Sequence, residues 1–111
     1  MKTTFSGRAA ESAVAEHLKQ QKYQILNQNW RTRTCEIDLV AKKDGVIYFC
    51  EVKMRSSPTQ GDGFEYITPA KLKQMTYAAE VWCQENDWPG DCRLLAAAVT
   101  DDNQQINIVE I

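Results

Sequence analysis

The sequence has few of the residues that form metal clusters or disulfide frameworks. Its 111 residues include four cysteines and one histidine, and no two cysteines have the C-x-x-C spacing of common zinc sites. We therefore expect no structural zinc. The cysteines are expected to be reduced thiols, with Cys50 in the core and the other three half-buried: Cys35, Cys83 and Cys92.

Long apolar runs and an excess of one charge are also missing. The longest apolar runs, 46–50 and 94–99, are far shorter than the ~20 residues of a membrane-spanning helix. The first residues contain no apolar stretch before a cleavage site, so we expect a cytoplasmic protein that does not enter a membrane. Thirteen basic and fifteen acidic side chains give a net charge of −2, which excludes a polybasic coating of nucleic acid. A polyanionic partner would have to meet a local basic patch.

What remains is the composition of one globular domain, spanning residues 1–111. Hydrophobic residues make up 43% of the chain and charged residues 25%, close to the average for such domains. A chain of this length buries on folding roughly 60 to 70% of the surface that its unfolded form exposes. Its core therefore needs no disulfide or metal ion to be stable.

Two segments have the pattern of helices. Residues 7–21 are rich in alanine, lack proline and place apolar side chains on one stripe. Glu11 lies at the edge of that stripe, where a carboxylate needs a partner. The second helix begins with Thr68 as its N-cap and Pro69 at its first position, and it ends before residue 86.

Five further segments have the composition of strands: 23–30, 35–41, 46–53, 93–99 and 105–111. Asp44-Gly45 predicts a hairpin between the second and third strands, which are then antiparallel. The second helix connects the third and fourth strands, so these two are expected to be parallel. The prediction is an α/β fold of order αβββαββ, with a mixed central sheet and helices on both faces.

The predicted hairpin brings two carboxylates together. Strict alternation in 35–41 puts Ile37 and Leu39 on one face and Asp38 on the other. A turn centred on residues 43–44 pairs Asp38 with residue 49, beside Glu51 on the same face. Burying two adjacent carboxylates costs several kcal/mol unless positive charge joins them.

Lys53, two residues after Glu51, can neutralise only one of these carboxylates, whereas a divalent cation neutralises both. Two carboxylates, a backbone carbonyl and water molecules are ligands that suit Mg²⁺ or Mn²⁺. Such a cation activates a bound water and stabilises charge on a phosphate, and a nearby lysine can orient or deprotonate that water. This set of groups is typical of phosphodiester hydrolysis.

Two segments, CEIDLVA at 35–41 and YFCEVKMR at 48–55, resemble the YraN family of small bacterial proteins, which look like PD-(D/E)xK nucleases. The resemblance covers nearly the whole chain and implies a restriction-endonuclease-like fold, similar to archaeal Holliday junction resolvases. Other residues match the family as well: Gly7, Glu11, Tyr23, Asn29, Arg31 and Lys71. The chain departs from the family at Cys35, where glycine is usual, and at 93–95, where Arg-Leu-Leu replaces Arg-Phe-Asp.

The resemblance also implies roles for individual residues. Asp38, Glu51 and the carbonyl of Val52 would hold the metal, and Lys53 would be the catalytic lysine. Glu11 matches the first-helix carboxylate of the wider superfamily and would complete the metal shell, directly or through water.

Basic side chains flank the carboxylates in sequence and are predicted to contact nucleic-acid phosphates: Arg31, Arg33, Arg55, Lys71 and Lys73. Lys71 and Lys73 fall in the first turn of the second helix, where a cation opposes the helix dipole unless an anion is near. We therefore expect Lys71 to contact a phosphate or the site itself.

The predicted function is a Mg²⁺- or Mn²⁺-dependent endonuclease that cleaves branched or structured DNA. A homodimer would suit a four-way junction, which has two symmetric strands to cut. Two alternatives stay open on the same fold. One is a non-catalytic module that binds nucleic acid or a protein, and the other is an enzyme acting on RNA.

Overall fold

The elements follow the predicted order. The computed structural model describes residues 7–55, 64–100 and 105–111. Within them lie α1 (Gly7–Gln20), β1 (Gln24–Arg31), β2 (Glu36–Lys43), β3 (Val46–Arg55), α2 (Pro69–Glu85), β4 (Cys92–Thr100) and β5 (Ile106–Glu110). The order αβββαββ is confirmed, and β3 extends two residues beyond its predicted end. Most of the predicted loop 54–67 and turn 100–104 lies outside the described residues.

The strands of the described residues form one mixed sheet with the order β1-β2-β3-β4-β5. The pair β3–β4 is parallel, and the other neighbouring pairs are antiparallel. The helix α2 connects the two parallel strands, because strands that run the same way need a crossover between them. Both the parallel pair and the antiparallel hairpin are confirmed.

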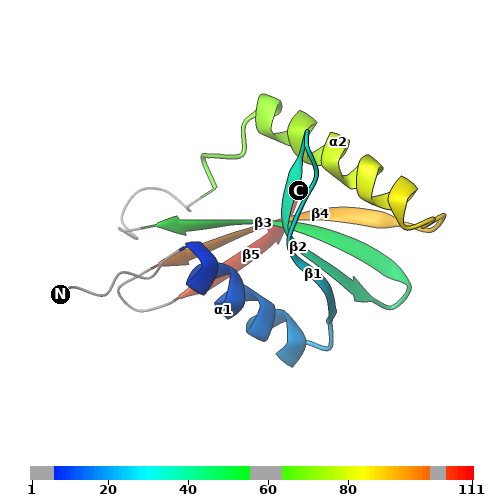
Figure 1. Ribbon diagram of the computed structural model, residues 1–111. Coiled ribbons are helices and arrows are strands. Elements are labelled where there is room, and N and C mark those ends of the chain that lie inside the picture. Colours follow the sequence, from blue (N-terminus) through cyan, green and yellow to red (C-terminus); the bar gives the residue numbers. More distant parts are fainter. Residues whose placement is uncertain (1–6, 56–63, 101–104) are drawn as a thin grey trace.

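The two helices cover opposite faces of the sheet, as predicted (Figure 1). Val14 and Leu18 of α1 pack in one core cluster with Leu39 of β2. Trp82 of α2 packs in the other cluster, where its ring meets Phe49 edge to face at 5.5 Å. Because both faces are covered, the polar side chains of the central strands β2 and β3 reach water mainly near the strand ends.

The β2–β3 hairpin differs from the prediction in its register. Asp44 and Gly45 have φ of 51° and 79°, as a two-residue type I′ turn requires, so the turn is centred on residues 44–45. Val40, and not Asp38, pairs with Phe49. The predicted pairing of Asp38 with residue 49 is therefore wrong by two residues, and continuing the observed register brings Asp38 level with Glu51.

The strict alternation predicted for β2 also fails at the start of the strand. Ile37 packs with Val40 in the cluster beneath α2, whereas Leu39 packs beneath α1. The ladder between β2 and β3 ends at Leu39, so the first residues of β2 pair with β1 alone. This freedom lets the backbone leave regular alternation around Asp38.

The cysteines are free thiols, as expected. Cys50 is buried and Cys35 and Cys83 are half-buried, but Cys92 is exposed, which corrects the prediction for that residue. Among the described residues, neither helix has the length and apolar character needed to cross a lipid bilayer.

Candidate functional site

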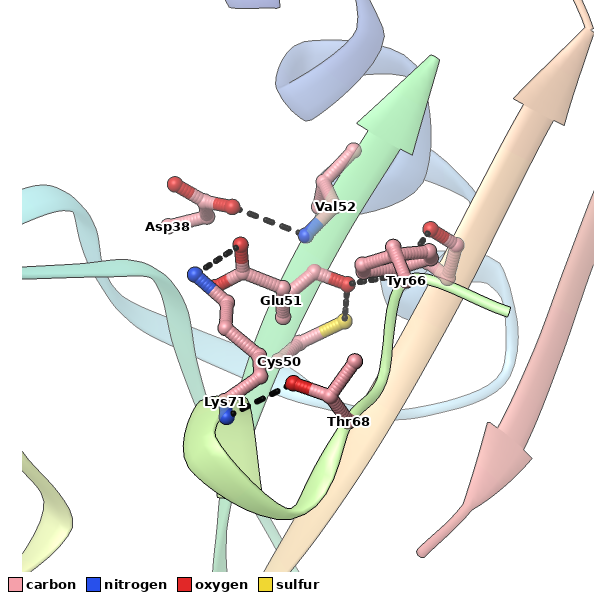
Figure 2. Close-up of polar contacts among 8 residues, drawn as sticks. Asp38, Cys50, Glu51, Val52, Tyr66, Thr68 and Lys71 are labelled. Carbon is pink, nitrogen blue, oxygen red and sulfur yellow. Dashed lines mark hydrogen bonds and ion pairs between the residues drawn. The ribbon is translucent and has the colours of Figure 1, made fainter. Parts of the chain in front are cut away.

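Asp38 occupies the point where β2 and β3 separate. One residue beyond the last ladder pair, its Oδ2 accepts a hydrogen bond of 2.8 Å from the backbone N–H of Val52. The carboxylate thus takes the place of a strand carbonyl and is held at the carboxyl-terminal half of β3. Figure 2 shows this bond beside the carboxylate of Glu51.

Glu11 approaches Asp38 from α1. Its side chain is 9% exposed, and its carboxylate is close enough to Asp38 for a hydrogen bond between the two groups. Glu11 Oε1 is buried and has no hydrogen-bond partner among the residues that the structure describes. Glu11 lies along the buried face of α1, as the sequence predicted, so its carboxylate points into the protein. One of its oxygens has no hydrogen-bond partner there within the described part of the chain.

Glu51 is contacted by a cation from α2. The Nζ atom of Lys71 lies 3.0 Å from Glu51 Oε2, and the two side chains are 31% and 20% exposed. Thr68 caps the helix by accepting a bond of 3.1 Å from the N–H of Lys71, which fixes the start of α2 beside the site. Lys71 therefore contacts a carboxylate of the candidate site, which is one of the two contacts expected for it, and its binding to a nucleic-acid phosphate stays a prediction.

The electrostatics of the site favour positive charge. The pKa of Asp38 is raised to about 6, chiefly by burial and with smaller contributions from the neighbouring charges of Glu11 and Glu36, while the hydrogen bond from Val52 acts to lower it. Burial and the charge of Asp38 also raise the pKa of Glu51, and Lys71 lowers it in part. Carboxylates are therefore crowded here beyond what Lys71 neutralises.

Tyr66 is a contact that the sequence reasoning missed. Its hydroxyl lies 3.4 Å from the carbonyl oxygen of Glu51 and 3.2 Å from that of Ala97, so it bridges β3 and β4 (Figure 2). Burial raises the pKa of this hydroxyl, which keeps it a donor. The one available signal was an aromatic residue just before the Thr68-Pro69 helix start.

The carboxylate oxygens of the site are ligands that suit a hard cation, although they do not form a complete coordination sphere. Among the described residues, no group of three or more His, Cys, Asp or Glu side chains is already placed to hold a metal ion. The unsatisfied oxygen of Glu11 and the raised pKa of Asp38 mark a place where positive charge is lacking. Oxygen donors of this kind match Mg²⁺ or Mn²⁺ rather than zinc.

Lys53 is exposed, and none of the described residues forms an ion pair with it. It lies on β3 two residues after Glu51 and, unlike Lys71, forms no ion pair with the carboxylates of the site in the described residues. Its predicted catalytic role stays a prediction.

The other predicted phosphate-binding residues differ in their surroundings. Arg31 lies 3.9 Å from Glu36 and Arg55 lies 3.1 Å from Glu65, each in an ion pair. The remaining two are exposed: Arg33 and Lys73. Nucleic-acid binding by these residues stays a prediction.

Comparison with known proteins places the chain among similar sequences. Residues 10–111 match the profile of a family described as uncharacterised protein family UPF0102. A UPF0102 protein of Oleidesulfovibrio alaskensis is 36% identical over 98 residues, which cover 87% of this chain and 48% of that protein. One from an Arthrobacter species is 36% identical over 97 residues, covering 86% of this chain and 82% of that protein.

A third similar protein, UPF0102 protein VP0448 of Vibrio parahaemolyticus, is 31% identical over 106 residues, covering 94% of this chain and 88% of that protein. The chain spans about half the length of the Oleidesulfovibrio protein and more than four-fifths of the other two. The names of these three proteins state no activity.

Proposed function

The chain belongs to the UPF0102 family, and we propose from its own side chains that it is a Mg²⁺- or Mn²⁺-dependent endonuclease acting on branched or structured DNA. In this proposal residues 1–111 form one nuclease domain with a restriction-endonuclease-like fold, as the resemblance to PD-(D/E)xK nucleases of the YraN type implies. The single observation that carries it is the position of Asp38, which lies beside Glu11 on one side and Glu51 on the other where β2 leaves β3.

Each residue has a defined part in the proposed reaction. Asp38 is oriented by the N–H of Val52, so that its carboxylate would hold a cation together with Glu51 and the Val52 carbonyl. Glu11 supplies the third carboxylate from α1. When bound, the cation would lower the pKa of a water molecule and neutralise charge on the scissile phosphate.

Lys53 and the other basic residues would act on the substrate. The exposed side chain of Lys53 orients the attacking water as an ammonium that donates a hydrogen bond, or, as the neutral amine, it accepts the proton of that water at Nζ. Arg31, Arg33 and Lys73 stand at the surface and would contact phosphates, as would Arg55 after leaving Glu65. A cytoplasmic location and a two-fold dimer complete the proposal.

The test is a cleavage assay with linear, flapped and four-way-junction DNA in Mn²⁺, in Mg²⁺ and in EDTA. We expect metal-dependent cutting of the branched substrates by the wild type, and a loss of at least about 100-fold in Asp38→Asn and Lys53→Ala. Cutting that survives EDTA or both substitutions would contradict the proposal. The same substrates made of RNA decide between DNA and RNA as the target.

A second candidate is a module that binds nucleic acid or a protein without cutting. The ion pair between Lys71 and Glu51 favours it, because a lysine that neutralises a carboxylate leaves less need for a metal. Binding of junction DNA without cleavage in any metal would favour this candidate over the nuclease.

A further inference from the structure

Lys71 has the position of a counter-ion within the candidate site. Its ammonium lies 3.0 Å from Glu51 Oε2, and both side chains are largely withdrawn from water. Of the described residues, only Lys71 forms an ion pair with any of the three carboxylates Glu11, Asp38 and Glu51. It therefore supplies the positive charge that faces Glu51 in the structure.

The placement of Lys71 is unfavourable without this partner. The first turn of α2 contains no acidic residue, and a cation there faces the positive end of the helix dipole. The Thr68 cap holds the backbone N–H of Lys71, so the side chain leaves the helix from a fixed point towards Glu51 (Figure 2). Glu51 and Lys71 thus stabilise each other across the gap between β3 and α2.

A divalent cation bound by Glu51 would meet the same ammonium. Like charges within a few ångströms of each other repel strongly where water is partly excluded. Both cations need the carboxylate of Glu51, so a metal ion and the ammonium of Lys71 compete for it.

We propose that Lys71 is a built-in competitor for the metal: a divalent cation can bind at Glu51 only after displacing the Lys71 ammonium. The inference rests on the proposed function in that it takes Glu51 as a metal ligand. It assigns Lys71 the role of setting the metal affinity of the site. When no metal is bound, the ammonium of Lys71 neutralises Glu51, and a metal ion takes over that role when it binds.

The experiment is a Mn²⁺ titration of the full chain, read by calorimetry and by the electron paramagnetic resonance signal of free Mn²⁺, so that no activity is needed. Lys71→Met should bind Mn²⁺ about fivefold more tightly than the wild type, which is the upper end of the scale for one partly exposed ion pair. Lys71→Arg, which keeps the charge, should bind like the wild type. Lys73→Met is the matched control, because it removes a charge from the same turn without touching Glu51, and should also bind like the wild type.

The outcomes separate the two proposals. If the wild type binds Mn²⁺ and Lys71→Met binds it equally or more weakly, the competition is refuted while the metal site stands. If Lys71→Met binds Mn²⁺ while the wild type and the double variant Lys71→Met/Glu51→Gln do not, the competition is supported. If none of the folded variants, checked by circular dichroism, binds millimolar Mn²⁺, both the competition and the metal site are refuted.

Discussion

At the scale of single residues, the site depends on carboxylates that the rest of the molecule forces together. Asp38 was recognisable in the sequence because an acidic residue in a hairpin partner faces the E-x-K segment. Its bond to the Val52 N–H was not predictable, because it depends on where the ladder ends. The contact of Tyr66 with Ala97 joins segments far apart in the chain, which local patterns do not encode. A contact of Lys71 with the site was expected from its place in the first turn of a helix, but its partner Glu51 was not.

Asp38→Asn should stabilise the metal-free protein at neutral pH. Burial raises the pKa of Asp38 from 3.8 to about 6, so the folded state holds more protons than the unfolded state between these values, and stability falls as the pH rises through them. Asparagine keeps an acceptor for the Val52 N–H and removes the charge. We expect a gain on the order of 2 kcal/mol at pH 7.5 in urea unfolding with EDTA.

At pH 4 the same substitution should gain much less, because most of Asp38 is then protonated in the folded state. Equal gains at the two pH values would show that the ionisation of Asp38 is not the cause.

Glu11→Gln should raise the free energy of unfolding in EDTA by about 1 kcal/mol, because it removes a buried charge and gives the amide a hydrogen to donate to Asp38. It should also weaken Mn²⁺ binding. Glu16→Gln is the matched control on the same helix, since Glu16 is exposed and, within the described part of the chain, forms an ion pair with Lys19 alone, at 3.3 Å. A destabilised Glu11→Gln, measured by denaturant unfolding, would contradict the account of a crowded site.

At the scale of elements, the hairpin turn decides which residues meet. The Asp44-Gly45 turn was predicted, but its centre was placed one residue too early, and that error moved the pairing by two residues. The signal for the correct centre was present, because a type I′ turn takes Asp-Gly as its two central residues. The departure of Ile37 from alternation had no such local signal.

Gly45→Ala should destabilise the protein by about 1 kcal/mol, because Gly45 has φ of 79°, which an L side chain adopts only with strain. Asp44→Gly should be close to neutral, since glycine adopts the φ of 51° at that position freely. Thermal and urea unfolding of the two variants measure the difference. A Gly45→Ala protein as stable as the wild type would mean that the turn does not hold the register.

At the scale of the whole molecule, the arrangement of two helices around a mixed sheet was predictable in the described residues because each element carries its own periodic pattern. The parallel pair β3–β4 followed from the helix that crosses over between the two strands. The site arises where β2, β3, α1 and α2 converge, so its assembly depends on packing that no single segment specifies.

Metal binding should therefore stabilise the whole fold. A Mn²⁺ concentration 100 times the dissociation constant is expected to add about 2.7 kcal/mol to the free energy of unfolding, because only the folded chain brings the carboxylates together. Glu51→Gln should show no such gain under the same conditions. Differential scanning calorimetry with and without Mn²⁺ measures it, and an equal gain in Glu51→Gln would place the metal elsewhere.

The most direct test of the metal site is a crystal soaked in Mn²⁺ and measured at a wavelength where manganese scatters anomalously. The account predicts an anomalous peak within about 2.5 Å of carboxylate oxygens of both Asp38 and Glu51, with Lys71 turned away from Glu51. A well-ordered crystal whose anomalous map is empty between these two side chains, with Lys71 still on Glu51, would contradict it.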